Sequence, residues 1–349
     1  MKKRGVFLIG LIVISVYYFL FPRGSGPEFV LQPIAVTPFG DDAPTDGRIS
    51  ASAVAVRGGE RIGFLDDEGA LAAYFRADAL AAGDGWIALR GPEGVDIRDA
   101  DGRLRARLNR PMQPETHRGR LYLGHRAAGR LLGVDPRNGA VLWEREYLVP
   151  ITVVDGSADR TLIGLLDGRI QLVDDDGRVL LDYQPGGSRL EAVYGGALSA
   201  DGRRIAIVSG LDPQRFILLE ERKNGYRPVS HHSTETDYRR RVAVGFVRSD
   251  AEVLYERSDG VADVALESFE VRRLEAPGRP VAWMDGPLDG FLTILGSDGD
   301  EAALRMVASN DRMMFHSILP SRVSGIQSVG DKLLIVDENR IAILESAVR

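Results

Sequence analysis

The chain contains 349 residues, 40 glycines, no cysteine and a formal net charge of −6. The absence of cysteine excludes disulfides, thiolate metal sites, cysteine nucleophiles and lipidation of an N-terminal cysteine. Three positive charges lie at positions 2–4, so the rest of the chain carries a net charge of −9, which argues against nucleic acid as a partner.

Residues 5–21, with the sequence GVFLIGLIVISVYYFLF, form an uninterrupted run of 17 uncharged positions. As a helix, this run would rise roughly 25 Å, which is close to the thickness of the hydrocarbon core of a bilayer. Because the basic residues precede the run, the positive-inside rule predicts a cytoplasmic N-terminus and a periplasmic remainder. The sequence therefore predicts a single-pass inner-membrane protein, with an anchor over residues 1–22 and a short tether over residues 23–27.

A cleaved signal peptide is the alternative to a retained anchor. Cleavage requires small residues at two spaced positions after the apolar run, and residues 21–27 (FPRGSGP) match this pattern weakly. We therefore expect the transmembrane helix to be retained.

After the tether, one pattern recurs along the chain: an apolar strand, a short turn, a second strand, an Asp-Gly or Asn-Gly turn, and a third strand. If each unit has four strands, the second strand of each begins near positions 52, 86, 121, 161, 204, 252, 291 and 332. These spacings match one propeller blade, and the absence of helices between the strands argues against a parallel α/β sheet. The sequence therefore predicts an all-β, eight-bladed β-propeller over residues 28–349, with seven blades as the alternative.

The last repeat stops one strand short of a full unit. A propeller that does not close leaves exposed strand edges, so the missing strand must come from elsewhere in the chain. Residues Glu28–Gln32 alternate suitably and precede the first repeat. We expect them to pair outside Arg340–Leu344 and to complete the ring.

Two repeats resemble those of known propeller families. Arg130–Tyr147, RLLGVDPRNGAVLWEREY, resembles the repeat of the PQQ-type (quinoprotein-like) propellers, and Leu198–Gly210, LSADGRRIAIVSG, resembles the repeat of TolB-type propellers. The architecture that these resemblances imply is also similar to that of the BamB-like outer-membrane assembly scaffolds. BamB-like proteins carry a lipid on a cysteine, which this chain lacks.

The PQQ resemblance also raises the question of a cofactor. PQQ-dependent dehydrogenases of this superfamily stack the cofactor on a tryptophan and often on a vicinal cysteine pair. Here Trp86, Trp143 and Trp283 all fall within repeat strands, and there is no cysteine. We interpret the three tryptophans as packing residues between blades and expect no cofactor.

A search for reactive motifs gives little. The sequence contains no Gly-x-x-x-x-Gly-Lys, His-Glu-x-x-His, Gly-x-Ser-x-Gly or Ser-x-x-Lys. His231 and His232 are adjacent, so on a strand they would point to opposite faces and could not readily chelate one metal. Asp174–Asp176 lack the spaced ligands of a calcium loop and are interpreted as a turn. We expect no catalytic, cofactor-binding or metal-binding residues.

Two functions remain open. The first is a non-catalytic scaffold in the bacterial cell envelope that binds a partner protein. The second is an envelope enzyme or ligand-binding propeller whose site is dispersed over several blades. Three or more convergent polar or charged groups in the central channel, with a metal or cofactor, would favour the second, whereas a channel lined by small apolar residues would favour the first.

The long connections indicate where a partner would bind. Connections between blades and those between second and third strands emerge on one side of a propeller, and the longest are Asn109–Arg120, Ser209–Gln214 and His231–Arg241. Positive charge and a tyrosine gather there, so we expect an acidic segment of an envelope protein to dock; the alternative is that these loops are merely solvated. The candidate partner-binding residues are Arg110, His117, Arg118, Arg120, His231, His232, Tyr238, Arg239, Arg240 and Arg241.

Overall fold

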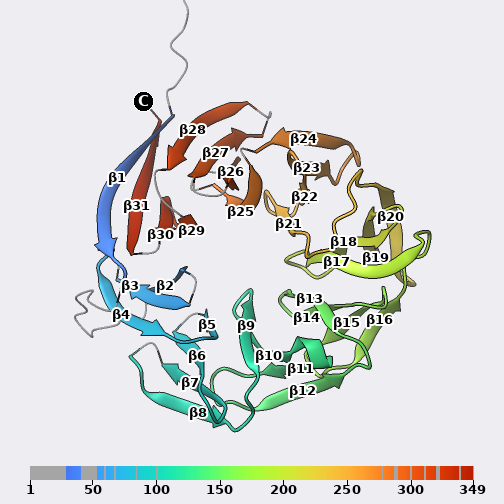
Figure 1. The fold of residues 1–349 in the computed structure, drawn as a ribbon, viewed down its shortest axis with the longest axis horizontal. Coiled ribbons are helices and arrows are strands. Elements are labelled where there is room, and N and C mark those ends of the chain that lie inside the picture. The colour runs from blue at the N-terminus through green and yellow to red at the C-terminus, as the bar shows by residue number, and fades with distance from the viewer. Residues whose placement is uncertain are drawn as a thin grey trace, which may run out of the picture.

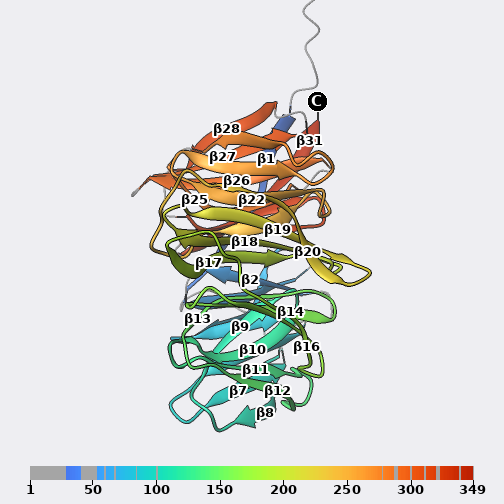
Figure 2. The same cartoon turned by 90° about the vertical axis from the view of Figure 1, so that its right-hand side faces the viewer.

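The computed structural model describes residues 29–40, 53–58, 60–66, 68–83, 85–99, 101–276, 278–286, 290–298, 301–309, 312–319, 323–337 and 339–348. The described residues form antiparallel sheets arranged as eight blades around a central channel (Figure 1). Figure 2 shows the same ring from the side. The anchor and tether expected over residues 1–27 lie outside the described residues, and no helix within the described ranges has the length and apolar character needed to span a bilayer.

The strands follow the order of the chain from sheet to sheet. The first sheet contains β2 (Val54–Gly58), β3 (Arg61–Leu65) and β4 (Leu71–Arg76). The second contains β5 (Leu80–Gly83), β6 (Trp86–Arg90), β7 (Val95–Asp99) and β8 (Leu104–Leu108). The third contains β9 (Gln113–His117), β10 (Arg120–His125), β11 (Arg130–Val134) and β12 (Val141–Glu146), with the 3₁₀ helix η1 (Arg126–Ala128) between β10 and β11. The fourth contains β13 (Ile151–Gly156), β14 (Arg160–Leu165), β15 (Ile170–Asp174) and β16 (Val179–Tyr183).

The second half of the ring repeats this arrangement. The fifth sheet contains β17 (Leu190–Leu198), β18 (Arg204–Leu211), β19 (Arg215–Arg222) and β20 (Gly225–Ser233). The sixth contains β21 (Val244–Val247), β22 (Glu252–Arg257), β23 (Gly260–Ala265) and β24 (Val271–Glu275). The seventh contains β25 (Arg279–Asp285), β26 (Phe291–Asp298), β27 (Glu301–Ala308) and β28 (Met313–Leu319). The last contains β29 (Val323–Val329), β30 (Lys332–Asp337), β31 (Arg340–Val348) and β1 (Phe29–Pro38).

The eight-bladed fold predicted from the repeat is confirmed. In the seven sheets of four strands, the second strand begins within one residue of its predicted position. In the first sheet, β4 is the outermost strand, because the turn glycine Gly102 of the next sheet packs against Phe75 of β4 just as Gly139 packs against Ala106 of β8. No innermost strand of the first sheet lies among the described residues.

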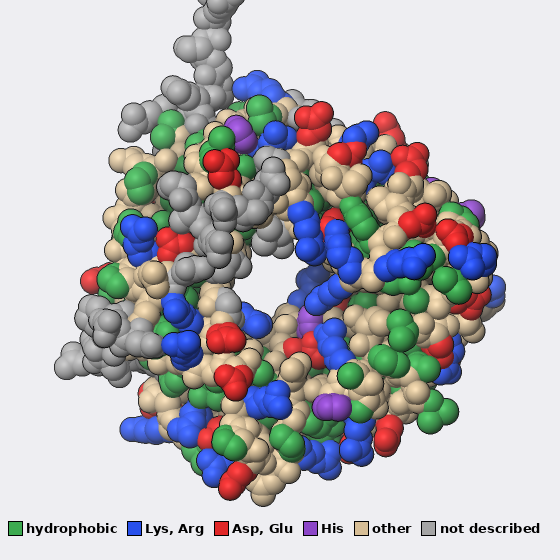
Figure 3. Space-filling model, viewed as in Figure 1, with side chains coloured by type: hydrophobic (Ala, Val, Ile, Leu, Met, Phe, Trp, Pro, Cys, Tyr) green, Lys and Arg blue, Asp and Glu red, His purple; other side chains and the backbone are tan. Residues whose placement is uncertain are grey.

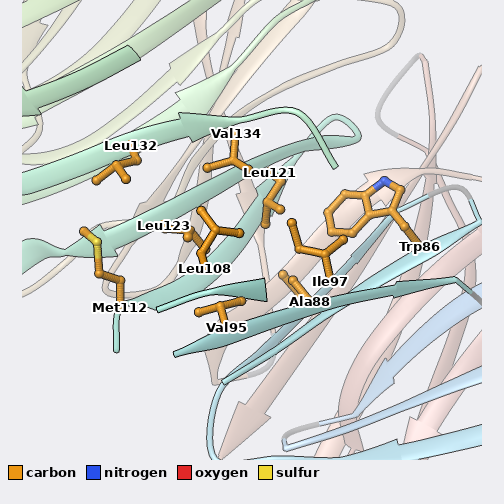
Figure 4. Close-up of a cluster of buried hydrophobic side chains, with 11 residues drawn as sticks. Trp86, Ala88, Val95, Ile97, Leu108, Met112, Leu121, Leu123, Leu132 and Val134 are labelled. Carbon is orange, nitrogen blue, oxygen red and sulfur yellow. The ribbon is translucent and has the colours of Figure 1, made fainter. Parts of the chain in front are cut away.

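The hydrophobic core lies between neighbouring sheets. Figure 4 shows one such layer, in which side chains of the second sheet meet those of the third. The layer uses alternate residues of each strand, since these point to the same face. Its members include Trp86, Ala88, Val95, Ile97 and Leu108 on one side and Leu121, Leu123, Leu132 and Val134 on the other.

The tryptophans belong to these layers. Trp86 and Trp143 are buried, and Trp283 packs against the layer between the sixth and seventh sheets. A Cβ at Gly133 would come within 2.4 Å of the Trp143 ring, so the absence of a side chain on β11 makes room for the indole on β12. The interpretation of the three tryptophans as packing residues is therefore confirmed.

The strand β1 completes the last sheet. It pairs antiparallel with β31, from Phe29 opposite Val348 to Pro38 opposite Arg340. The register differs from the predicted one, because β1 is longer than expected: Pro33–Pro38 lie opposite Arg340–Leu344, and the first residues of β1 lie opposite the end of β31. The end of the last repeat is thus joined to the beginning of the chain.

We expect β1 to stabilise the whole ring through Leu31, which is buried with Leu333 and Leu304. Replacement of Leu31 by Ala should lower the free energy of unfolding by about 2–3 kcal/mol. The matched control is Val36→Ala, because Val36 lies on the same strand with its side chain exposed, and its loss should cost less than about 0.5 kcal/mol. Thermal unfolding of the full chain in detergent measures both, and equal effects would contradict a closing role for β1.

Candidate functional site in the central channel

Charged side chains line the central channel. One cavity of about 440 Å³ is lined by residues of β2, β5 and β9, and a second of about 310 Å³ by residues of β13, β17, β21 and β25. His117 and Arg241 line both cavities. Figure 3 shows basic side chains along the channel wall on the side of β17 and β21. The channel is therefore the place where residues from separate blades converge.

His117, at the end of β9, lies between two carboxylates. Its Nδ1 is 3.4 Å from Oδ1 of Asp155 on β13, and its Nε2 is 3.5 Å from Oε2 of Glu115 on β9. The second oxygen of Asp155 accepts a hydrogen bond of 2.7 Å from the backbone N–H of Leu198 on β17. Three neighbouring blades are thus joined through one imidazole and one carboxylate.

The carboxylates favour the protonated imidazole. Burial alone disfavours the charged ring, but the hydrogen bonds and charges of Asp155 and Glu115 outweigh burial and raise the pKa of His117. Burial also opposes ionisation of Glu115, but His117 and Arg126 outweigh it and lower the Glu115 pKa. The Nε atom of Arg126 lies 3.1 Å from Oε1 of Glu115. The carboxylate oxygens and ring nitrogens of these groups thus contact one another in an ionic network. Within the described ranges, no three His, Asp or Glu side chains are arranged to hold a metal.

Arg241 differs from the rest of this network. Within the described part of the chain, its guanidinium has no hydrogen-bond or ion-pair partner. The side chain is open to water in the channel, yet the channel walls surround it. Burial, and after it the nearby charge of Arg126, lower the pKa of Arg241, while Glu115 and Asp155 act in the opposite direction. Arg241 is therefore a cation without a specific anion.

The predicted binding face is not one face. The segment Asn109–Arg120 was expected to be a loop, but it contains β9, which crosses the ring from one face to the other. Arg110 therefore lies on the face where the connections between sheets emerge, which we call the connection face. Arg118 lies with Arg120 on the opposite face. The prediction was wrong because β9 is short and polar, with the sequence QPETH, and lacks the apolar pattern of the other strands.

The candidates of this segment contact other parts of the ring. Arg110 forms an ion pair of 2.9 Å with Glu144. Arg118 donates to the backbone oxygen of Leu198 at 3.4 Å. Arg120 donates to the backbone oxygen of Ala158 at 2.9 Å and forms an ion pair with Asp175 of the next sheet. Arg118 and Arg120 therefore connect blades.

The histidine pair lies within β20 and not in a loop. Nδ1 of His231 is 3.0 Å from the Arg215 guanidinium, whereas Nε2 of His232 is 3.1 Å from the Tyr255 hydroxyl. The His232 ring also stacks on Phe216, with ring centroids 5.0 Å apart. The two side chains point to opposite faces of the strand, as the sequence predicts.

The arginine run at 239–241 has three separate roles. Arg239 is exposed and has no ion-pair partner within the described residues, and Arg241 faces the channel. Arg240 instead donates to both carboxylate oxygens of Glu256, at 2.9 and 2.7 Å, and its guanidinium lies over the Tyr238 ring. Arg240, a candidate partner-binding residue in the sequence, is thus engaged within the ring by Glu256.

The channel residues Glu115, Asp155 and Arg126 were not predicted from the sequence. They come from β9, β13 and η1, which are separate in the chain. The spacing of Glu115 and His117 is the one available signal, because residues two apart on a strand share a face. Nothing local indicates that Asp155 would meet them.

We expect Arg240→Ser to destabilise the protein. The Glu256 side chain is 2% exposed and would keep only its 3.2 Å contact with Arg279 and one backbone donor, Ala243. The free energy of unfolding should fall by about 1–3 kcal/mol. Arg241→Ser removes the same charge but no partner and should cost less than about 0.5 kcal/mol. Urea unfolding compares the two, and equal stability of the variants would contradict this assignment.

We expect the His117 contribution to stability to depend on pH. Because the folded-state pKa is raised, the contribution is fully present below the ordinary imidazole pKa of about 6.5 and is lost as pH rises through the folded-state pKa. The stability difference between the protein and His117→Gln should therefore shrink from pH 6 to pH 9. Unfolding at a series of pH values measures this difference, and a difference independent of pH would contradict it.

The comparison with His117→Gln is necessary because a second group, Asp263, also makes the stability fall as pH rises. Burial, and after it the charge of Glu252, raise the pKa of Asp263 to about 7. Its folded form binds a proton more tightly than the unfolded form, so stability also falls as pH rises toward that value. The background is common to both proteins and cancels in their difference.

Comparisons with known proteins agree with this architecture. A family model described as beta-propeller protein matches residues 1–346. An uncharacterized protein of Treponema pallidum (strain Nichols) is 26% identical over 311 residues, covering 84% of this chain and 81% of that protein. BamB from Moraxella catarrhalis gives a TM-score of 0.62 at 14% identity, over 90% of this chain and 100% of that chain. The computationally designed Ika8 protein gives 0.65 at 13% identity, over 85% and 94%. The structural likenesses show the fold alone, and on the family match the chain belongs to a β-propeller protein family.

Proposed function

We propose that the protein is a non-catalytic interaction scaffold of the bacterial cell envelope. In this proposal residues 5–21 hold it in the inner membrane, the propeller lies in the periplasm, and its repeats are of the PQQ or TolB type. The observation that carries the proposal is a surface on the connection face that combines exposed leucines with Arg239, which has no ion pair among the described residues.

The apolar part of this surface lies over the fourth sheet and the start of the fifth. Leu148, between β12 and β13, is 103% exposed, and Leu166 and Leu190 are about half exposed. The backbone N–H of Leu166 donates to the oxygen of Pro150, so the connection that carries Leu148 and the turn that carries Leu166 are neighbours. Figure 3 shows hydrophobic side chains over β13–β16 beside the basic channel wall. Exposed apolar groups rimmed by polar residues are typical of interaction sites.

The basic part supplies charge complementarity. Arg239 lies in the connection between β20 and β21 on the same face, and the body of the protein carries a net charge of −9 outside positions 2–4. A local positive group on an acidic body attracts an acidic segment selectively and fixes its orientation. The partner segment would therefore combine apolar and acidic side chains.

The state of the channel supports a non-catalytic role. Both ring nitrogens of His117 face carboxylates, Nδ1 that of Asp155 and Nε2 that of Glu115. Glu115 is likewise engaged by His117 and Arg126. The titratable groups that converge here stabilise one another.

A ligand-binding propeller is the second candidate. A dispersed site was expected to combine convergent charged groups in the channel with a metal or cofactor. The channel has the first of these features, since charged groups from several blades meet there. Arg241 is the specific observation in its favour, because the described residues provide no ion pair for it.

We expect the double variant Leu148→Ser/Arg239→Ser to bind its main partner protein more weakly. In-cell crosslinking with a reagent that does not cross the inner membrane, followed by capture of the full chain, measures this. Capture should fall at least about fivefold, because an apolar and an ionic contact are lost together. It should also weaken in high salt, since surface charges are screened.

The matched control is Leu180→Ser/Arg227→Ser. It removes the same residue types from the outer strands β16 and β20, where Leu180 is exposed and Arg227 has no ion pair within the described ranges. Equal capture by both double variants would reject this binding surface. Absence of any crosslink with the impermeant reagent would reject the proposed location.

A further inference from the structure

We propose that the central channel contains a carboxylate-binding site in which Arg241 is the primary contact. The site is distinct from the surface of exposed leucines and does not depend on the scaffold function. Its ligand is a carboxylate group, carried either by a small organic acid or by an acidic side chain inserted into the channel.

The first step of the argument is the local charge balance. Glu115 and Asp155 carry the negative charge of the network, and Arg126 and the protonated form of His117 balance it through direct contacts. Arg57 and Asp78, which also line the larger cavity, contribute one charge of each sign. Arg118, on the smaller cavity, has Asp250 at 4.0 Å. With His117 protonated, Arg241 remains as the cation at these two cavities that has no ion pair among the described residues.

The second step is the availability of hydrogen-bond acceptors. The oxygens of Glu115 contact Arg126 and His117, and those of Asp155 contact His117 and the N–H of Leu198. Each of these oxygens already has a donor, and Arg241 donates no hydrogen bond to them. A guanidinium keeps its charge and its planar set of donors, so an external acceptor would satisfy it.

The third step is the chemistry of the ligand. A guanidinium binds a planar carboxylate through two parallel hydrogen bonds. A single excess positive charge matches a single carboxylate, whereas a phosphate dianion would be repelled by Glu115 and Asp155 on the same wall. A cation would meet Arg241, Arg126 and Arg118. The two cavities, of about 440 and 310 Å³, admit a group of the size of a glutamate side chain.

The fourth step concerns strength. The channel walls partly bury the Arg241 guanidinium, and Arg126 repels it. Both effects disfavour its positive charge and lower the pKa of Arg241. A bound anion relieves both effects. An ion pair in such a partly enclosed site is screened less by salt than one on the outer surface.

The test uses two probes, the monocarboxylate butyrate and the capped peptide acetyl-Gly-Glu-Gly-amide. The full chain in detergent, with labelled histidines, is titrated with each probe, and the imidazole resonance of His117 reports binding in the channel. We expect a saturable shift with at least one probe. The variant Arg241→Gln should bind at least about tenfold more weakly, because the charged bidentate contact is lost.

The matched control is Arg227→Gln. It removes the same charge from the outer strand β20, at an exposed position without an ion pair in the described residues. It should bind the probes as the unmodified protein does. Saturable binding of butyrate alone identifies a small organic acid, and binding of the peptide alone identifies an acidic segment; both support the site. No saturable shift, or equal weakening by Arg241→Gln and Arg227→Gln, would overturn it, whatever the outcome of partner capture through Leu148.

Discussion

The structure depends on one constraint, that each antiparallel sheet has two faces to bury and can bury them only between two neighbours. The layers between sheets satisfy this constraint in sequence around the ring. Leu31 joins the layer between the seventh and last sheets, and Phe39 joins the layer between the last sheet and the first. Because β1 and the residue that follows it, Phe39, contribute to these two layers, the N-terminal strand is needed to satisfy the constraint in the last sheet.

Close approach between sheets follows from small residues at the turns. A Cβ on Gly177 would lie 2.5 Å from the Cβ of Trp143, and one on Gly139 would lie equally close to Ala106. Both glycines have positive φ, which other residues adopt with strain. The Asp-Gly and Asn-Gly turns of the repeat therefore serve two purposes, since they reverse the chain and let the next sheet pack beside it.

Ionic contacts add a second connection between sheets. Glu256 of the sixth sheet is bound by Arg240 and also by Arg279 at the start of the seventh. Arg248 donates to the backbone oxygen of Ala308 at the end of β27. These charges lie where apolar layers end, so they satisfy polar groups that the ring would otherwise bury unpaired. Most arginines of the channel wall belong to this structural class, and this is why Arg241 is distinctive.

A rigid ring turns the channel into a fixed arrangement of side chains. His117, Asp155 and Leu198 come from three successive blades, and their mutual distances depend on the angle between those blades. A binding site of this kind needs no motif in the chain, because the fold supplies the proximity.

The sequence alone predicted the second, third and fourth strands of the repeat, favoured eight blades over seven and predicted the closing role of an N-terminal strand, but it missed the polar strand β9. These follow from local signals, namely alternation with a period of two, turn residues and a repeat that stops one strand short. The opposite orientation of His231 and His232 follows from the same period. The register of β1 could not be predicted, because it depends on how far the strand extends along β31.

Only the tertiary structure decided which charged residues meet. Glu115, Arg126, Asp155 and Arg241 are separated by up to 126 positions, and no local pattern relates them. The neighbours Arg240 and Arg241 look alike in the sequence, yet one binds a buried carboxylate and the other faces the channel. Strand periodicity gives the direction of a side chain within its own sheet, but the packing of separate blades determines what that side chain contacts.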